Sequence, residues 1–193
     1  MDTDAADLFP LPPGLPVPAD DGAADHLPGQ PVPALTLPAT DGSQVPLAGL
    51  GAGRTVIYLY PMTGRPGVDL PEGWDDIPGA RGCTPESCGF RDLMADLADA
   101  GAGRVYGLSS QSSDYQREAV SRLHLPFSML SDERLALAGA LGLPTLTVDG
   151  MTLYRRLTMV ITDGVIEHVF YPIFPPDQHA QEVLDWLRAH PRS

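Results

Sequence analysis

The chain has 193 residues, of which 25 are acidic and 12 are basic, and its formal net charge is −13. Every basic residue is an arginine, which excludes a Schiff-base lysine and the lysine of a phosphate-binding loop. An acidic chain without a basic stripe argues against nucleic acid and anionic membranes as partners, and no apolar run reaches the ~20 residues that span a bilayer. With two cysteines and no recognisable secretory signal, we expect a cytoplasmic protein.

Residues 1–30 form an acidic segment rich in proline, which precludes a regular helix. Its composition predicts a flexible tail, followed by one folded domain over residues 31–193. An alternative remains open, in which the apolar side chains of the tail dock on the domain or on a second subunit. These side chains are Leu8, Phe9, Leu11, Leu15 and Val17.

The folded part is expected to begin with two short strands and a longer one. Residues 34–37 and 44–47 flank the turn sequence Thr40-Asp41-Gly42, a pattern that predicts a β-hairpin. Residues 55–60 are a continuous apolar run, which is typical of a buried central strand. Residues 62–80 are rich in Gly and Pro and predict a long loop, and long loops in compact domains are often functional.

The remaining elements alternate between strand and helix. This order predicts the α/β class, with a mixed central sheet flanked by helices and an N-terminal β-hairpin addition. After the loop we expect a helix from Thr84 to about residue 100, a strand at 105–109, a helix from Ser113 or Asp114 to Leu123, a strand at 127–130, a helix at 133–141, two strands at 152–162 and 165–171, and a helix at 177–189.

Both cysteines lie where the helix from Thr84 begins. Thr84 suits the N-cap and Pro85 the first helical position, so Cys83 lies at the positive end of the helix dipole. Such a site can lower the pKa of a thiol from near 8.5 to roughly 3.5–7.5. On an ideal helix the Cα atoms of Cys83 and Cys88 would be ~8.6 Å apart, beyond the ~7 Å reach of a disulfide. The two thiols could then bond only after the first turn unwinds.

Two other interpretations of the cysteines carry less weight. They could be inert buried thiols, although the helix start favours a reactive thiolate. They could also bind zinc, but zinc needs about four ligands and the histidines outside the tail show no paired spacing.

The run Gly82-Cys83-Thr84-Pro85-Glu86-Ser87-Cys88-Gly89-Phe90-Arg91-Asp92 resembles the motif of peroxiredoxins, specifically the peroxiredoxin Q or bacterioferritin-comigratory group. The resemblance covers roughly residues 32–189 and implies a thioredoxin-like fold. It also implies that Cys83 is the peroxidatic cysteine and Cys88 the resolving one. No motif implies a metal, haem or flavin cofactor.

The resemblance further points to an arginine. In these proteins an arginine on a late strand, before a Thr or Ser and an apolar run, points at the peroxidatic sulfur. Arg156 matches this position, whereas Arg155 would face the other way on a strand. A guanidinium there would stabilise the thiolate and polarise the O–O bond. The alternative is an ordinary surface arginine.

The loop before Cys83 departs from the family pattern, which usually reads Pro-x-x-x-Thr-x-x-Cys. Ala80 stands where the threonine is expected. We expect Thr63, displaced by an insertion, to fold back towards the site; the alternatives are Thr84 or a backbone N–H. Trp74, within the same insertion, would cover the site, face a partner or anchor the loop.

These inferences predict a thiol-dependent peroxidase that reduces hydrogen peroxide and organic hydroperoxides. Cys83 would form a sulfenic acid, Cys88 would convert it to a disulfide, and thioredoxin or a glutaredoxin-like protein would reduce that disulfide. The protein would be a monomer or a weak homodimer. The alternatives are a protein dithiol-disulfide oxidoreductase, which more often has Cys-x-x-Cys, and a non-enzymatic redox sensor.

Overall fold

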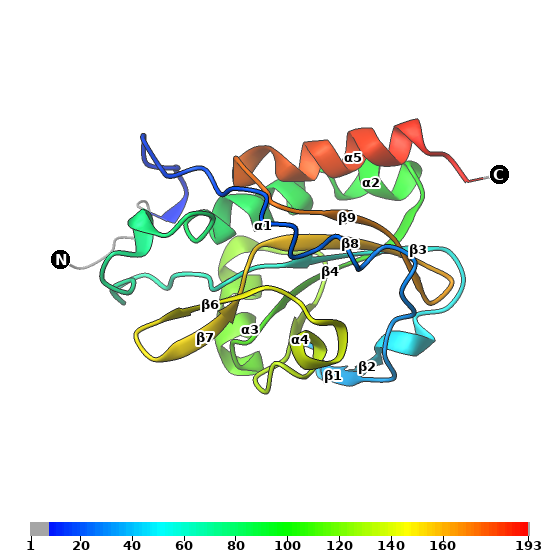
Figure 1. The fold of residues 1–193 in the computed structure, drawn as a ribbon, viewed down its shortest axis with the longest axis horizontal. Helices are drawn as coiled ribbons and strands as arrows, with labels where there is room; N and C mark the ends of the chain where they lie inside the picture. The colour runs from blue at the N-terminus through cyan, green and yellow to red at the C-terminus, as the bar shows by residue number, and fades with distance from the viewer. Residues whose placement is uncertain (1–7, 193) are drawn as a thin grey trace.

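A five-stranded sheet with the strand order β5-β4-β3-β8-β9 lies at the centre of the fold, in a computed structural model that describes residues 8–192 (Figure 1). Strands β3, β4 and β5 are parallel, whereas β8 and β9 run antiparallel to their neighbours. The mixed sheet confirms the predicted fold class. Its strands are β3 (Arg54–Leu59), β4 (Ala102–Ser109), β5 (Met129–Ser131), β8 (Leu157–Thr162) and β9 (Val165–Phe170).

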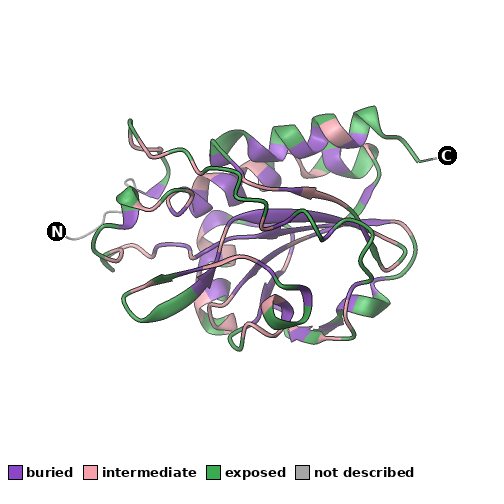
Figure 2. Cartoon of the chain, in the orientation of Figure 1, coloured by how far each residue is buried: buried purple, intermediate pink, exposed green. Residues whose placement is uncertain are grey.

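Strand β3 is the middle strand of the sheet, and both of its faces are covered. All six of its residues are buried, as the sequence predicted from the continuous apolar run (Figure 2). Successive side chains of a strand point to opposite faces. Accordingly, Val56 and Tyr58 belong to one core cluster, and Ile57 and Leu59 belong to the other.

Helices cover both faces of the sheet. The cluster that contains Tyr58 is covered by α1 (Cys83–Asp92), α2 (Met94–Asp99), α3 (Ser113–Leu123) and α5 (His179–Ala189). The opposite cluster is covered by α4 (Ala136–Leu141) and by the predicted N-terminal hairpin of β1 (Thr36–Pro38) and β2 (Gln44–Pro46). Figure 1 shows α2 and α5 on one side of the sheet and α4 with the hairpin on the other. Short 3₁₀ turns lie at Leu47–Gly49, Trp74–Asp76 and Pro176–Gln178.

Two predicted elements are each divided in the structure. The single helix expected from Thr84 is interrupted at Leu93, whose φ and ψ of −101° and 8° leave the helical region. The single strand expected at 152–162 is wrong as well. Strand β7 (Met151–Tyr154) pairs with β6 (Thr145–Val148) in a hairpin that was not predicted, and β8 begins only at Leu157. The hairpin turns at Asp149-Gly150, where φ is positive at both residues, as in a tight two-residue turn.

The N-terminal segment contacts the domain at several of its described residues. Leu8, Ala24 and Leu27 are buried, and the hydroxyl of Tyr171 donates a hydrogen bond to Asp21. Phe9 and Val17 are exposed. The expected division of the chain into residues 1–30 and 31–193 stays a prediction. The aspartates of the N-terminal segment at positions 2, 4 and 7 lie outside the described residues. Within residues 8–192, no helix combines the length and apolar character that a membrane span requires.

Candidate active site

Cys83 is the first residue of helix α1, and Gly82 is its N-cap. The φ of Gly82 is 115°, a conformation that side chains other than glycine rarely adopt. A Cβ at this position would also lie 2.3 Å from Pro176 Cγ and 2.9 Å from Leu11 Cδ2. The N-cap prediction for Thr84 is wrong, because Thr84 lies inside the first turn. The expected position of Cys83 at the positive end of the helix nevertheless holds.

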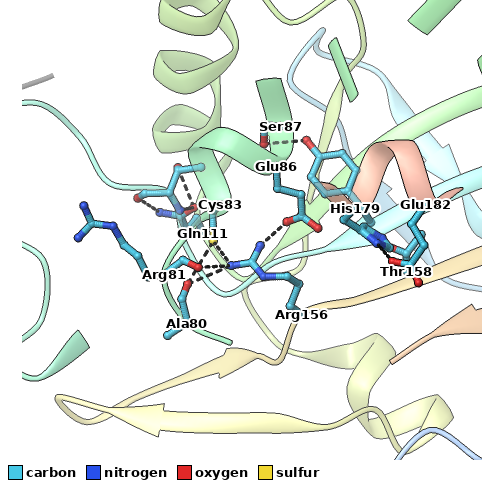
Figure 3. A network of polar contacts seen from close by, with 12 residues as sticks. Ala80, Arg81, Cys83, Glu86, Ser87, Gln111, Arg156, Thr158, His179 and Glu182 are labelled. Atoms are coloured by element: carbon cyan, nitrogen blue, oxygen red, sulfur yellow. Dashed lines mark hydrogen bonds and ion pairs between the residues drawn. The ribbon is translucent and has the colours of Figure 1, made fainter. Parts of the chain in front are cut away.

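The guanidinium of Arg156 lies beside the Cys83 sulfur (Figure 3). Its Nη2 is 3.3 Å from Cys83 Sγ and donates to the carbonyl oxygen of Ala80 at 3.0 Å. Its Nη1 forms a buried ion pair with Glu86. The Cys83 thiol also has the Ala80 carbonyl as an acceptor, at 3.7 Å. The residue that stands in place of the expected threonine therefore contributes a backbone oxygen to the site.

The break between β7 and β8 consists of two adjacent arginines, Arg155 and Arg156. Arg156 is buried and reaches Cys83, whereas Arg155 donates from Nε to the carbonyl oxygen of Thr145 at 3.0 Å. The two side chains therefore contact different parts of the protein, as predicted, although the residues lie in a bend between two strands and not within one strand.

Sequence reasoning missed two residues of the polar network around Arg156. Glu86 is fully buried, and its Oε1 has no hydrogen-bond partner within the described part of the chain. His179 is buried too, with Nε2 2.7 Å from Thr158 Oγ1 and Nδ1 2.9 Å from Glu182 Oε2. Glu86 follows Cys83 by three residues on one helix, a spacing that could have identified it. His179 precedes Val183 and Leu187 at the four-residue spacing of a buried helix face.

Burial decides the acidity of both thiols. It raises the pKa of Cys83 even though the Arg156 charge opposes it, and the Glu86 carboxylate raises it further. The expected lowering of the Cys83 pKa is therefore wrong for this covered arrangement, because desolvation disfavours the thiolate. Burial likewise raises the pKa of Cys88, against the charge of Arg91. The direction of the shift thus does not distinguish the two thiols, whereas contact with Arg156 does.

Burial and neighbouring charges act in opposite directions on the pKa of each member of the ion pair beside Cys83. Burial raises the pKa of Glu86, although Arg156 and His179 act against it. Burial alone would lower the pKa of Arg156, but the charges of Cys83 and Glu86 outweigh it and raise that pKa. The guanidinium therefore stays charged, and its favourable partners are Cys83 and Glu86.

Cys88 lies in an apolar environment further along α1. Its side chain is 8% exposed and belongs to the core cluster of Tyr58 and Phe90. Both cysteines are free thiols. Because both belong to one helix of ten residues, they are arranged as the sequence predicted, with ideal Cα atoms ~8.6 Å apart.

Thr63 lies near the site, but its hydrogen bonds go to Gln111. Its backbone N–H and its hydroxyl donate to Gln111 Oε1 at 3.0 and 3.3 Å, and Gln111 Nε2 donates back to the Thr63 carbonyl at 3.2 Å. The small cavity at Cys83 is lined by Thr84, with Met62 and Gly64 on either side of Thr63 in the chain. A direct role of Thr63 in the reaction stays a prediction.

Trp74 fixes the insertion between β3 and α1. It is 3% exposed and packs in a cluster with Leu146 of β6 and Leu153 of β7. It also lines the cavity at Cys83. Trp74 therefore covers the site and anchors the loop, and its burial leaves little of it for a partner surface.

The described residues bring no metal-ligand set together. Within residues 8–192, no group of three or more His, Cys, Asp or Glu side chains is placed to hold a metal ion.

Comparison with known proteins places this geometry among redox proteins. The sequence model of the Redoxin family matches residues 27–184. Peroxiredoxin Bcp of Escherichia coli is 32% identical over 168 residues, which cover 84% of this chain and 96% of that protein. The chloroplastic peroxiredoxin Q of Sedum lineare is 30% identical over 161 residues, covering 83% of this chain and 77% of that protein. The crystal structure of peroxidoxin BcpB from Mycobacterium tuberculosis is similar with a TM-score of 0.67 and 28% identity, covering 87% of this chain and all of that one.

Proposed function

Because the chain belongs to the Redoxin family, with the Bcp and peroxiredoxin Q proteins as relatives, we propose that it is a thiol peroxidase in which Cys83 reacts with the peroxide and Cys88 resolves the product. The observation that carries this assignment is the 3.3 Å contact between Arg156 Nη2 and Cys83 Sγ at the start of α1. Cys88 has no such contact with Arg156 among the described residues and lies in the apolar core.

The first step consumes one hydroperoxide. The Cys83 thiolate attacks the terminal oxygen of ROOH, the O–O bond breaks, and Cys83 becomes a sulfenic acid. The leaving RO⁻ takes a proton and departs as an alcohol, or as water when the substrate is hydrogen peroxide. The guanidinium of Arg156 stabilises the negative charge on sulfur before the attack and on the leaving oxygen during it.

The second step closes a disulfide. The Cys88 thiol attacks the Cys83 sulfenic sulfur, an S–S bond forms, and the sulfenic oxygen leaves as water. Because the ideal Cα separation of ~8.6 Å exceeds disulfide reach, the first turn of α1 must unwind before this bond forms. An external dithiol of the thioredoxin or glutaredoxin type then reduces the disulfide by thiol exchange and is itself oxidised.

Two cysteine variants test this division of roles. Cys83→Ser should abolish peroxide consumption, whereas Cys88→Ser should still consume one equivalent and carry a trapped sulfenic acid at Cys83, detected by mass spectrometry. Oxidation of Cys88 in the Cys83→Ser protein would reverse the assignment. Rapid reduction of insulin disulfides without peroxide consumption would favour a dithiol-disulfide oxidoreductase instead.

A further inference from the structure

The Cys83 thiol is almost closed off from solvent. Its residue is 3% exposed, and the cavity beside it has a volume of about 10 Å³. That volume is close to the smallest that holds one water molecule. Hydrogen peroxide is larger than water, so it needs a small displacement of the cavity wall to reach the sulfur, and a larger substrate needs a greater one.

Part of the cavity wall is apolar and comes from two irregular segments, whereas Arg81 and Thr84 contribute polar lining. Leu70 and Trp74 come from the insertion before α1, and Leu8 comes from the N-terminal segment. Leu8 is 4% exposed and presses on the backbone of Gly64, where an added Cβ would lie 2.6 Å from Leu8 Cδ2 and 3.3 Å from Leu70 Cδ2. Leu8 therefore forms part of the cavity wall beside Cys83, packed against Gly64.

The segment that carries Leu8 is held by side-chain packing. Within residues 8–192, no backbone–backbone hydrogen bond joins residues 8–20 to the domain. The contacts of this segment include Leu11 above Gly82 and Pro18 against Gly79. Packing of a few apolar side chains can be released locally at low cost compared with global unfolding.

We propose that Leu8 is a specificity-determining residue, which favours hydrogen peroxide over hydroperoxides with a bulky organic group. This inference rests on the proposed peroxidase function and names its substrate preference. With Leu8 seated, hydrogen peroxide needs only a small displacement of the wall. A branched or aromatic hydroperoxide must displace Leu8 before its terminal oxygen reaches Cys83, so its reaction is slowed by the fraction of time that the site is open.

The test compares Leu8→Ala with two matched controls in the full chain. Leu8→Met keeps the side-chain volume, and Phe9→Ala changes a neighbour that is 44% exposed. We measure the rate constant for oxidation of Cys83 by hydrogen peroxide and by cumene hydroperoxide. Leu8→Ala should raise the rate with cumene hydroperoxide about tenfold relative to the rate with hydrogen peroxide, whereas both controls keep the original ratio. An unchanged ratio in Leu8→Ala overturns the proposal.

A second measurement does not depend on peroxidase activity. In a Cys88→Ser background, Cys83 is alkylated with iodoacetamide or with the bulkier N-ethylmaleimide. Leu8→Ala should accelerate the bulkier reagent by the larger factor, even if the protein turns over no peroxide. Equal acceleration of both reagents would show that Leu8 stabilises the segment generally and selects nothing by size.

Discussion

The two sides of the Cys83 sulfur are built from different kinds of structure. On the polar side, Arg156 comes directly before β8 and Glu86 comes from α1, and their charges are paired and buried. On the apolar side, Leu8 and Trp74 come from segments without long regular elements. The polar side places charged groups at the sulfur, and the apolar side covers it.

The match to known proteins separates Leu8 from Trp74, Glu86 and Arg156. Arg156 and Glu86 lie within residues 27–184, the range that the Redoxin family model matches, whereas Leu8 lies outside that range. Reactivity and access can therefore change separately in this protein. A substitution on one side should leave the other side intact.

The largest effect should come from the polar side. Arg156→Met removes the cation beside Cys83, so the already raised pKa of that thiol should rise further and the thiolate fraction at pH 7 should fall. We expect the peroxide step to slow by about 10²–10³-fold, the usual result of losing one electrostatic stabiliser. Because a raised pKa leaves the thiol protonated, the rate of the peroxide step should increase with pH in both proteins. The rise should occur at higher pH in the variant than in the unchanged protein. Stopped-flow rates and thiolate absorbance against pH measure both effects.

Two controls separate charge from folding in that experiment. Arg155→Met alters the neighbouring arginine, which bonds to Thr145 instead of the sulfur, and should leave the rate nearly unchanged. Arg156→Met alone leaves Glu86 as an unpaired buried charge, a loss of about 3–5 kcal/mol in the free energy of unfolding. Adding Glu86→Gln should restore much of that stability, and because it removes a charge that raises the Cys83 pKa it should recover only a small part of the rate, since the cation is still missing. A normal rate in Arg156→Met would remove this arginine from the site.

The apolar side should respond in stability more than in chemistry. Trp74→Ala empties a buried position between the insertion and the β6–β7 hairpin, so the free energy of unfolding should fall by about 3 kcal/mol. The rate with hydrogen peroxide should change far less than in Arg156→Met. Urea denaturation gives the stability, and Glu72→Ala, an exposed change in the same segment, is the control. An unchanged denaturation midpoint would contradict the packing described for Trp74.

Oxidation should change the structure only locally. Formation of the Cys83–Cys88 bond should unwind the first turn of α1 and leave the central sheet intact, because only a local opening is needed. Hydrogen exchange of the reduced and disulfide forms should differ mainly in residues 80–92 and in the segments that touch them. Equal protection there in both forms, with the bond verified, would falsify the view that oxidation requires unwinding.

The sequence predicted the parts of the fold that depend on local pattern. The apolar run of β3 and the turn at Asp163-Gly164 both correspond to observed elements. The similar pair Asp149-Gly150 was missed because the strands on either side of it have only four residues each, too few to show a clear alternation. The strand predicted at residues 152–162 therefore included most of β7, and the break before β8, where Arg156 points towards Cys83, was not predicted.

The sequence predicted the contact between Arg156 and Cys83 better than it predicted the surroundings of that contact. Cys83 and Arg156 were found from spacing and from resemblance to a family, and they are in contact in the structure. The direction of the Cys83 pKa shift could not be predicted, because it depends on burial by residues distant in sequence, such as Leu8. The partner of Thr63 could not be predicted either, since Gln111 follows it by 48 residues.

The position of Cys88 has a consequence for the reduction potential of the protein. Its side chain packs in the core beside Tyr58 and Phe90, where a free cysteine behaves as a small apolar residue. If Cys88 leaves this position to join Cys83, its apolar contacts are lost, and the disulfide form is destabilised relative to the dithiol. Each 1.4 kcal/mol lost in this way raises the potential by about 30 mV. The same packing that keeps Cys88 buried would therefore make the Cys83–Cys88 disulfide easy to reduce. Such a disulfide is suited to repeated reduction by a dithiol donor.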